Sequence, residues 1–472
     1  MIANPIDGVD RGVEVPCQTP YVADSNLKET ALQCHPKVAG YSWATRVSGP
    51  SFGRVRILHC STQICVTHFC VIQNSAMVNP FEYGRELGTN ELADREKEVA
   101  AVIQTVEQGS KLFLVGPRRF GKTSILKTAE DQLTKTGAIV LRFDAESYPS
   151  LDLFVSSLIA SAAKSLKGTV ERVGDQIRSF FSRLRPELSF NLSQDTWSAK
   201  IGVNTAPSLD SHVTLLVEAL NGLESLAQAQ SKNQAVGLIV DEFQKVIELG
   251  GTQTESQIRA AIQRHKRIGY VFAGSKTRML SAMTMDPARP FYRLGSVHFL
   301  GPVPAKDFER FLTSKFRQTG FRVEDEAAPQ RILALAENVP YNVQQLAYMC
   351  WNQLRNRPLK PAAVLDQQVI DESLDLIVRQ YDPFYTQLWS SLTSIQQKTL
   401  LAVIQEQGEK LKSQKVSQLV GKGTSTVQRS LGALSDKEIL REEEHEGGLR
   451  MRFEDPFFAQ WICAFRVSAD GF

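Results

Sequence analysis

The chain has 472 residues, enough for two to four domains, and its 42% hydrophobic and 22% charged content is typical of a globular protein. A formal net charge of +3 gives no strong attraction to nucleic acid or to a membrane surface. No uninterrupted apolar run reaches about 18 residues, and acidic side chains stand where a secretory signal needs positive charge. We therefore expect a cytoplasmic protein without a membrane span.

Residues 1–76 differ from the rest of the chain. They hold five of the seven cysteines and three of the seven histidines, and they show no sustained helical or alternating period. The spacing of Cys60, Cys65, His68 and Cys70 departs from the paired Cys-x-x-Cys pattern of zinc sites, so zinc and a disulfide framework are both disfavoured. We interpret this stretch as an unstructured N-terminal extension and Met77 as the start of the globular protein.

A short apolar run at 111–115 predicts a buried strand, and apolar residues at helical spacing from Ile125 to Leu133 predict a helix. Between them lie two glycines four residues apart, followed by Lys and Thr. Strand, glycine loop and helix in this order predict a loop whose backbone N–H groups cradle nucleotide phosphates. The expected cofactor-binding residues are Gly116, Pro117, Arg118, Arg119, Phe120, Gly121, Lys122, Thr123 and Ser124.

The predicted ligands are ATP and Mg²⁺. Lys122 would contact the β- and γ-phosphates, and Thr123 would offer its hydroxyl to the metal. The apolar run at 237–240 ends in Asp241 and Glu242, as expected of a buried parallel strand that meets the ligand edge of a sheet. Asp241 would hold Mg²⁺, and Glu242 would polarise the attacking water. The alternative is that both acids begin a solvated loop.

Further strands are predicted at 138–144, 269–275 and 297–300, giving about five parallel strands with crossover helices. Alternation within 187–203 predicts an inserted β-hairpin, and helical patterns cover 151–167, 211–230 and 257–267. Ser275, at the ligand end of its strand, either senses the γ-phosphate or caps the following helix. Arg289 or Arg293 could act as an arginine finger; the alternatives are solvated loop residues or structural ion pairs.

Together these residues resemble the archaeal-type P-loop ATPases, a branch of the AAA+-related and STAND-like signalling NTPases. The resemblance covers about residues 79–465, and the double arginine Arg118-Arg119 is its most specific mark. Where that family usually has Gly-x-Pro-Tyr, this chain has Asn338 in place of the glycine. The matching segments are 79–81, 93–98, 116–124, 239–244, 272–275 and 338–341.

The expected fold is an α/β P-loop NTPase, a parallel sheet with flanking helices, followed by a helical lid and a C-terminal winged-helix domain. The expected domain bounds are 77–303 for the ATPase domain, 304–380 for the lid and 381–465 for the winged helix. Successive helical patterns at 305–319, 324–337 and 340–355 form the lid. Patterns at 395–407, 411–420 and 424–434, with strands at 438–441 and 449–453, form the winged helix.

Two classes of function follow. From residue 384 to 462 the chain carries ten Lys/Arg and ten Asp/Glu, a net charge of zero, and the predicted hairpin tip at 442–446 is acidic. Lys422 and Arg429 are the only strong cations around the third helix, whereas a DNA-contacting winged helix offers a basic face. We therefore predict an ATP-hydrolysing switch that passes its nucleotide state to a protein partner or through self-association. The alternative is a DNA-associated ATPase that binds duplex through the winged helix.

Overall fold

The structure is a computed structural model, and the elements described below belong to the unit Met77–Phe472 of the chain. The described residues are 78–88, 91–165, 188–191, 196–199, 209–231, 234–251, 253–323, 325–357, 363–445 and 448–467. The predictions for residues 1–76, including the disfavoured zinc site, lie outside them. Among the described residues, no helix is both long and apolar enough to cross a lipid bilayer, and no cluster of His, Cys, Asp or Glu has the composition of a metal site.

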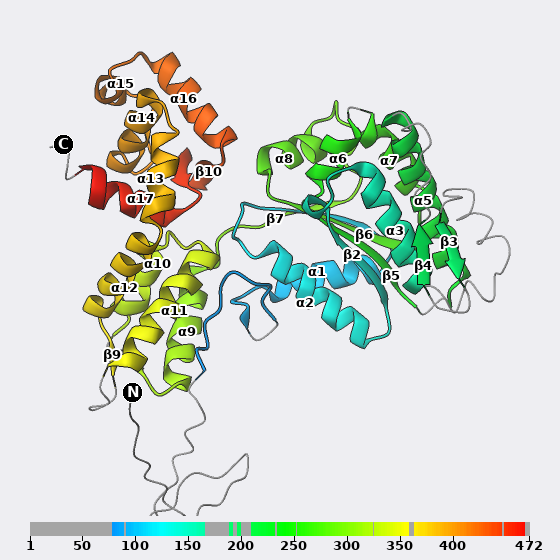
Figure 1. Ribbon diagram of the computed structural model, residues 1–472, viewed down its shortest axis with the longest axis horizontal. Helices are drawn as coiled ribbons and strands as arrows, with labels where there is room; N and C mark the ends of the chain where they lie inside the picture. The colour runs from blue at the N-terminus through cyan, green and yellow to red at the C-terminus, as the bar shows by residue number, and fades with distance from the viewer. Residues whose placement is uncertain are drawn as a thin grey trace, which may run out of the picture. The chain divides into compact units, whose positions relative to one another are not determined.

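The sheet has five parallel strands, as the sequence predicted (Figure 1). In spatial order they are β2 (Ile139–Asp144), β5 (Val236–Asp241), β6 (Ile268–Gly274), β1 (Lys111–Val115) and β7 (Ser296–Phe299). The three central strands β5, β6 and β1 are almost entirely buried, because helices cover both faces. The carboxyl ends of β1 and β5 both point to one edge, where ligands bind in sheets of this kind.

Alternate side chains along the strands pack into two separate cores. Leu112 and Leu114 of β1 face one core, whereas Phe113 and Val115 face the other. The first core is completed by α1 (Glu96–Glu107) and α2 (Lys122–Lys135). The second is completed by α3 (Leu151–Ser165), α5 (Leu209–Ala229), α6 (Gln244–Gly250), α7 (Thr254–Ile262) and α8 (Thr277–Met285). A 3-10 turn, Ala145–Ser147, follows β2.

Two local features refine the predictions for this part of the chain. The inserted segment forms an antiparallel pair, β3 (Leu188–Asn191) with β4 (Thr196–Ala199). The helix predicted at 257–267 is displaced, because α7 ends at Ile262 and residues 263–267 turn into β6. His265 is buried in this turn and bonds the Tyr270 hydroxyl and Asn221, a tertiary contact that overrides the helical pattern.

The helical segment after the sheet contains the three predicted helices and one further helix that was not predicted from the sequence. Its elements are α9 (Ala305–Gln318), β8 (Arg322–Val323), α10 (Ala327–Leu335), α11 (Pro340–Asn356), β9 (Val364–Leu365) and α12 (Gln367–Gln380). β8 and β9 form a short parallel pair. The missed helix α12 is capped by Asp366, whose carboxylate accepts from the Val369 N–H.

The last segment contains three helices followed by a β-hairpin, within a frame of two further helices. Its elements are α13 (Asp382–Ser390), α14 (Ser394–Gln405), α15 (Gln414–Val420), α16 (Thr424–Asp436), β10 (Leu440–His445), β11 (Gly448–Phe453), α17 (Pro456–Ile462) and a π-helical turn, Cys463–Val467. A capping box of Thr393 and Gln396 starts α14. Asp455 caps α17, and Pro456 occupies its first turn.

The lid and the winged helix share one continuous hydrophobic core rather than two. Ile377 of α12 belongs to the same buried cluster as Tyr385, Phe458 and Trp461 of the winged helix. The Trp461 indole also donates to Asp382 at 2.7 Å. Because a shared core resists separation, these two segments should move as one body relative to the sheet.

Candidate nucleotide-binding and hydrolysis site

The loop between β1 and α2 has the backbone that a phosphate cradle needs. Gly121 has φ 88°, a left-handed conformation that favours glycine, and it immediately precedes the first turn of α2. A side chain at Gly116 would lie 2.7 Å from the Leu300 Cβ, so the loop can approach β7 only with glycine there. The two glycines of the motif are thus required for different reasons: Gly121 for its left-handed backbone conformation and Gly116 for the close approach of Leu300.

Lys122 lies at the N-terminus of α2 and is 5% exposed. Its ammonium donates to the carbonyls of Gly116 and Pro117, both at 2.9 Å, so it closes the loop on itself. Burial lowers the pKa of Lys122, while Glu242 and Asp241 raise it. A phosphate group would give this buried ammonium the charged partner that two carbonyls do not provide.

Thr123 and Asp241 meet at the ligand edge of the sheet. The Thr123 hydroxyl donates to Asp241 Oδ2 at 2.7 Å, although the two residues lie 118 positions apart in sequence. Asp241 is 2% exposed, and burial raises the pKa of its carboxyl against the lowering effect of the Thr123 hydrogen bond. A hydroxyl and a buried carboxylate are hard oxygen donors of the kind Mg²⁺ takes, so these two residues fit the metal that the sequence predicts.

Glu242 follows directly and adopts φ 47°, an uncommon value for a residue other than glycine. Its Oε2 accepts three hydrogen bonds: from the Ser275 N–H at 3.1 Å, the Ser275 hydroxyl at 2.9 Å and the Gln244 amide. Burial acts to raise the pKa of Glu242, but Lys122 and these hydrogen bonds outweigh it and lower the pKa. The carboxylate is therefore held ionised.

Ser275 is 8% exposed, and its hydroxyl bonds Glu242 rather than the next helix. The N-cap of α8 is Lys276, without a side-chain capping bond. The alternative interpretation of Ser275 as a helix cap is thus wrong. The bonded pair lies between β5 and β6, because Ser275 follows β6 and Glu242 follows β5.

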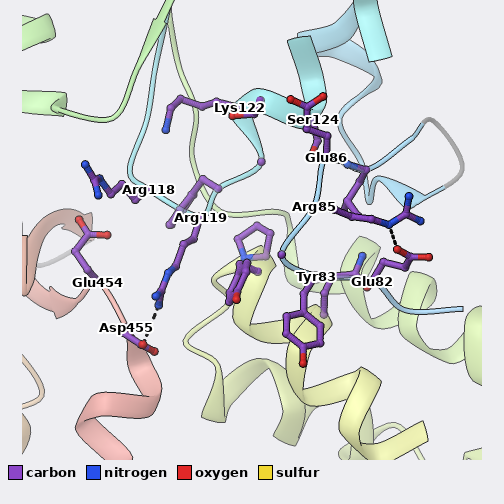
Figure 2. A pocket seen from close by; sticks show the side chains of 18 of the residues that line it. Glu82, Tyr83, Arg85, Glu86, Arg118, Arg119, Lys122, Ser124, Glu454 and Asp455 are labelled. Carbon is purple, nitrogen blue, oxygen red and sulfur yellow. Dashed lines mark hydrogen bonds and ion pairs between the residues drawn. The ribbon is translucent and has the colours of Figure 1, made fainter. Parts of the chain in front are cut away.

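A cavity of about 830 Å³ lies over the loop. Its walls come from the segment before α1, the phosphate loop, the lid helix α11 and the winged helix. Glu242, Lys122 and Thr123 line it, as do Arg95 and Tyr341. Figure 2 shows Tyr83 and Arg85 on the side of the segment before α1, and Glu454 and Asp455 on the winged-helix side.

The double arginine of the loop makes contacts that the sequence did not reveal. Arg119 pairs with Asp455 at 2.9 Å (Figure 2) and lies 5.1 Å over the Tyr341 ring, and Arg118 pairs with Glu438 at 3.0 Å. These partners lie more than 200 positions away along the chain. No local pattern could have singled them out, because Glu438 and Asp455 resemble other surface acids in the sequence.

The two candidate arginine fingers are placed differently from each other. Arg289 forms a two-pronged ion pair with Glu255 of α7, a carboxylate that is itself buried. Arg293 is exposed, has φ 53° and lies 5.1 Å over the Tyr292 ring. Neither arginine lines the cavity. Arg289 therefore matches the structural alternative, and Arg293 keeps a side chain that a second molecule could reach.

Comparison with known proteins adds three findings. Residues 383–464 match the family model described as a probable winged helix domain. A Walker-type ATPase of Pyrococcus abyssi has a similar structure, with a TM-score of 0.54 and 15% identity, over 81% of this chain and 99% of that one. No curated protein matches the sequence.

Two ORC proteins of Aeropyrum pernix are less similar. The ORC2 protein solved with ADPNP and ADP has a TM-score of 0.45 at 13% identity, over 81% of this chain and 96% of that one. The ORC1 protein in complex with DNA has a TM-score of 0.39 at 12% identity, over 82% and 96%. These two likenesses carry no weight for the function of this chain.

At these identities a likeness establishes fold and not activity. The chain therefore has the fold of the archaeal-type P-loop ATPases, a parallel sheet with flanking helices, and it ends in a winged-helix domain. Both were expected from the resemblance in the sequence.

Proposed function

We propose that this protein is a Mg²⁺-dependent ATPase that acts as a switch of the STAND-like type. The observation that supports this most directly is the hydrogen bond of 2.7 Å between Thr123 and Asp241, with Lys122 and Glu242 beside it. Phosphoryl transfer depends on positioning and charge neutralisation, and this group supplies one ammonium, two oxygen donors for a metal and one ionised carboxylate.

Each residue has a role that its contacts support. Lys122 would leave the two loop carbonyls and donate to the β- and γ-phosphates. Bound Mg²⁺, held by Thr123 and Asp241, would neutralise charge on the phosphate oxygens. All three hydrogen bonds to Glu242 end on Oε2, and Oε1 accepts none among the described residues. Glu242 would therefore orient water with Oε1. Ser275 fixes the direction of that carboxylate.

Nucleotide binding provides the first test. Titration with a fluorescent ATP analogue should show tight, Mg²⁺-dependent binding that Lys122→Ala abolishes and that Asp241→Asn makes insensitive to Mg²⁺. Lys127→Ala is the matched control, since Lys127 lies on the same helix but pairs with Asp131 at 2.8 Å and does not line the cavity. Equal binding by wild type and Lys122→Ala would contradict the assignment of the loop.

The proposed switch role is supported by the contacts that the lid and the winged helix make to the phosphate loop. Tyr341 of the lid and Asp455 of the winged helix both contact Arg119 of the phosphate loop. Because the lid and the winged helix share one core, a change at the loop would be felt by both. We propose that their combined movement presents a surface to a protein partner or to a second copy.

A DNA-associated ATPase remains the second candidate. The net charge of the winged helix is zero, but the positions of its charged residues favour this candidate more than that total does. Four cations of the winged helix are exposed and form no ion pair among the described residues: Lys410, Lys412, Lys422 and Arg429. In contrast, Glu438 and Glu442 pair with Arg118 and Arg278 of the ATPase domain. The zero net charge therefore combines exposed cations that form no ion pair among the described residues with acids that pair with the ATPase domain.

A further inference from the structure

Two arginine side chains of the phosphate loop form ion pairs with acids of the winged helix. Arg118 Nε lies 3.0 Å from Glu438 Oε2, and Arg119 Nη1 lies 2.9 Å from Asp455 Oδ2. Figure 2 shows both arginines directed from the loop toward the turn that carries Glu454 and Asp455. Two consecutive loop residues thus hold carboxylates with guanidinium groups that could also bind phosphate oxygens.

Asp455 contacts the phosphate loop, the lid and the winged helix at once. Besides Arg119, its carboxylate accepts from the Asn342 amide of α11 at 3.0 Å and from the Tyr385 hydroxyl of α13 at 3.0 Å. It also accepts from the Phe457 N–H at 3.1 Å and so caps α17. One side chain therefore joins the loop, the lid and two elements of the winged helix.

The loop's next residue makes a third contact to the same domain. The guanidinium of Arg441, on β10, lies 5.3 Å over the Phe120 ring, and this arginine is 6% exposed. Arg118, Arg119 and Phe120 are consecutive, so the winged helix contacts three successive residues at the centre of the phosphate loop. Such a contact can sense a change in the shape or charge of the loop.

A third carboxylate makes this arrangement unfavourable once phosphate is present. Glu454 lines the cavity together with Glu438 and Asp455, and its Oε2 is buried without a hydrogen-bond partner among the described residues. Burial raises the pKa of Glu454, and the positive charges of Arg441, Lys122 and Arg119 act in the opposite direction. Nucleotide phosphates bound to the loop would bring further negative charge toward these three carboxylates, and like charges in a partly buried site repel strongly.

We propose that Glu438 and Asp455 form an acid latch that holds Arg118 and Arg119 in the nucleotide-free protein and competes with ATP for them. Binding of ATP phosphates releases the latch and frees the body formed by lid and winged helix. This inference rests on the proposed nucleotide site and adds the regulation of that site by the chain's own acids.

The test compares the ATP affinity of the full-length wild type with that of two variants. Glu438→Gln combined with Asp455→Asn removes the latch charge but keeps side-chain size, and the Asn can still cap α17. Partly exposed ion pairs of this kind are weak, so the double variant should bind ATP about three- to thirtyfold more tightly than wild type. Glu406→Gln is the control, because Glu406 pairs with Lys415 at 2.6 Å inside the winged helix. Its affinity should equal that of wild type.

Hydrogen–deuterium exchange gives a readout that needs no substitution. A non-hydrolysable ATP analogue should raise exchange at residues 438–441 and 454–458 of wild type, and the double variant should show that raised exchange without nucleotide. An unchanged or weaker affinity in the double variant, or protection of these residues by the analogue, would overturn the latch while leaving the ATPase intact. If wild type and variants all fail to bind nucleotide, the proposed function fails first and the latch falls with it.

Discussion

Replacement of Glu242 by Gln should separate ATP binding from ATP hydrolysis. All three hydrogen bonds to Glu242 end on Oε2, so the carbonyl oxygen of a glutamine can accept the same bonds from Ser275 and Gln244. The amide nitrogen would then replace Oε1, the oxygen that we assign to water. The fold and the nucleotide pose should therefore persist, while the basic atom is lost.

The magnitude follows from the protonation behaviour of Glu242. Loss of a general base slows a reaction by about 10²–10⁴-fold, which corresponds to about 2.7–5.4 kcal/mol in the activation barrier. The lowered pKa of Glu242 keeps it ionised but also makes it a weak base, and weak bases contribute less. We therefore expect a decrease nearer to the lower end, about 10²-fold.

The assay is phosphate release at saturating Mg²⁺ and ATP, together with a binding titration for each variant. Glu248→Gln is the matched control, since Glu248 lies on α6, pairs with Lys276 and does not line the cavity. Its rate should equal that of wild type. A wild-type rate for Glu242→Gln, or a loss of affinity as large as that of Lys122→Ala, would refute the assignment of the base.

Three further outcomes are expected. Because burial raises the pKa of Asp241, this carboxyl keeps its proton to a higher pH than an ordinary aspartate. Turnover should therefore rise with pH through that pKa, and excess Mg²⁺ should move the midpoint of this rise to lower pH. A midpoint that does not change with Mg²⁺ concentration would contradict the assignment of Asp241 as a metal ligand. A chain that starts at Met77 should keep the melting temperature and turnover of the full chain, since the preceding sequence shows no structural period. Random duplex DNA should bind no more tightly than about 10⁻⁶ M at physiological salt by fluorescence anisotropy. Tighter binding with a steep salt slope, lost in Arg429→Ala, would favour the DNA-associated alternative.

The phosphate loop and the sheet could be predicted because their signals are local. Five strands were expected, and five parallel strands are present, since each is a short apolar run bounded by turn residues. The winged helix was also recognisable from three short helices and a hairpin. The helix predicted at 257–267 was wrong at its end, because the buried contacts of His265 override a pattern that reads as helical.

The sequence alone predicted which residues would meet a phosphate and a metal, because a glycine loop, a lysine and two acids after an apolar run are recognised by their spacing along the chain. Only the tertiary structure decided which carboxylates occupy Arg118 and Arg119. It also decided that the Ser275 hydroxyl donates to Glu242 instead of capping a helix. These contacts join residues that lie 33 to more than 300 positions apart, and packing rather than local propensity brings such residues together.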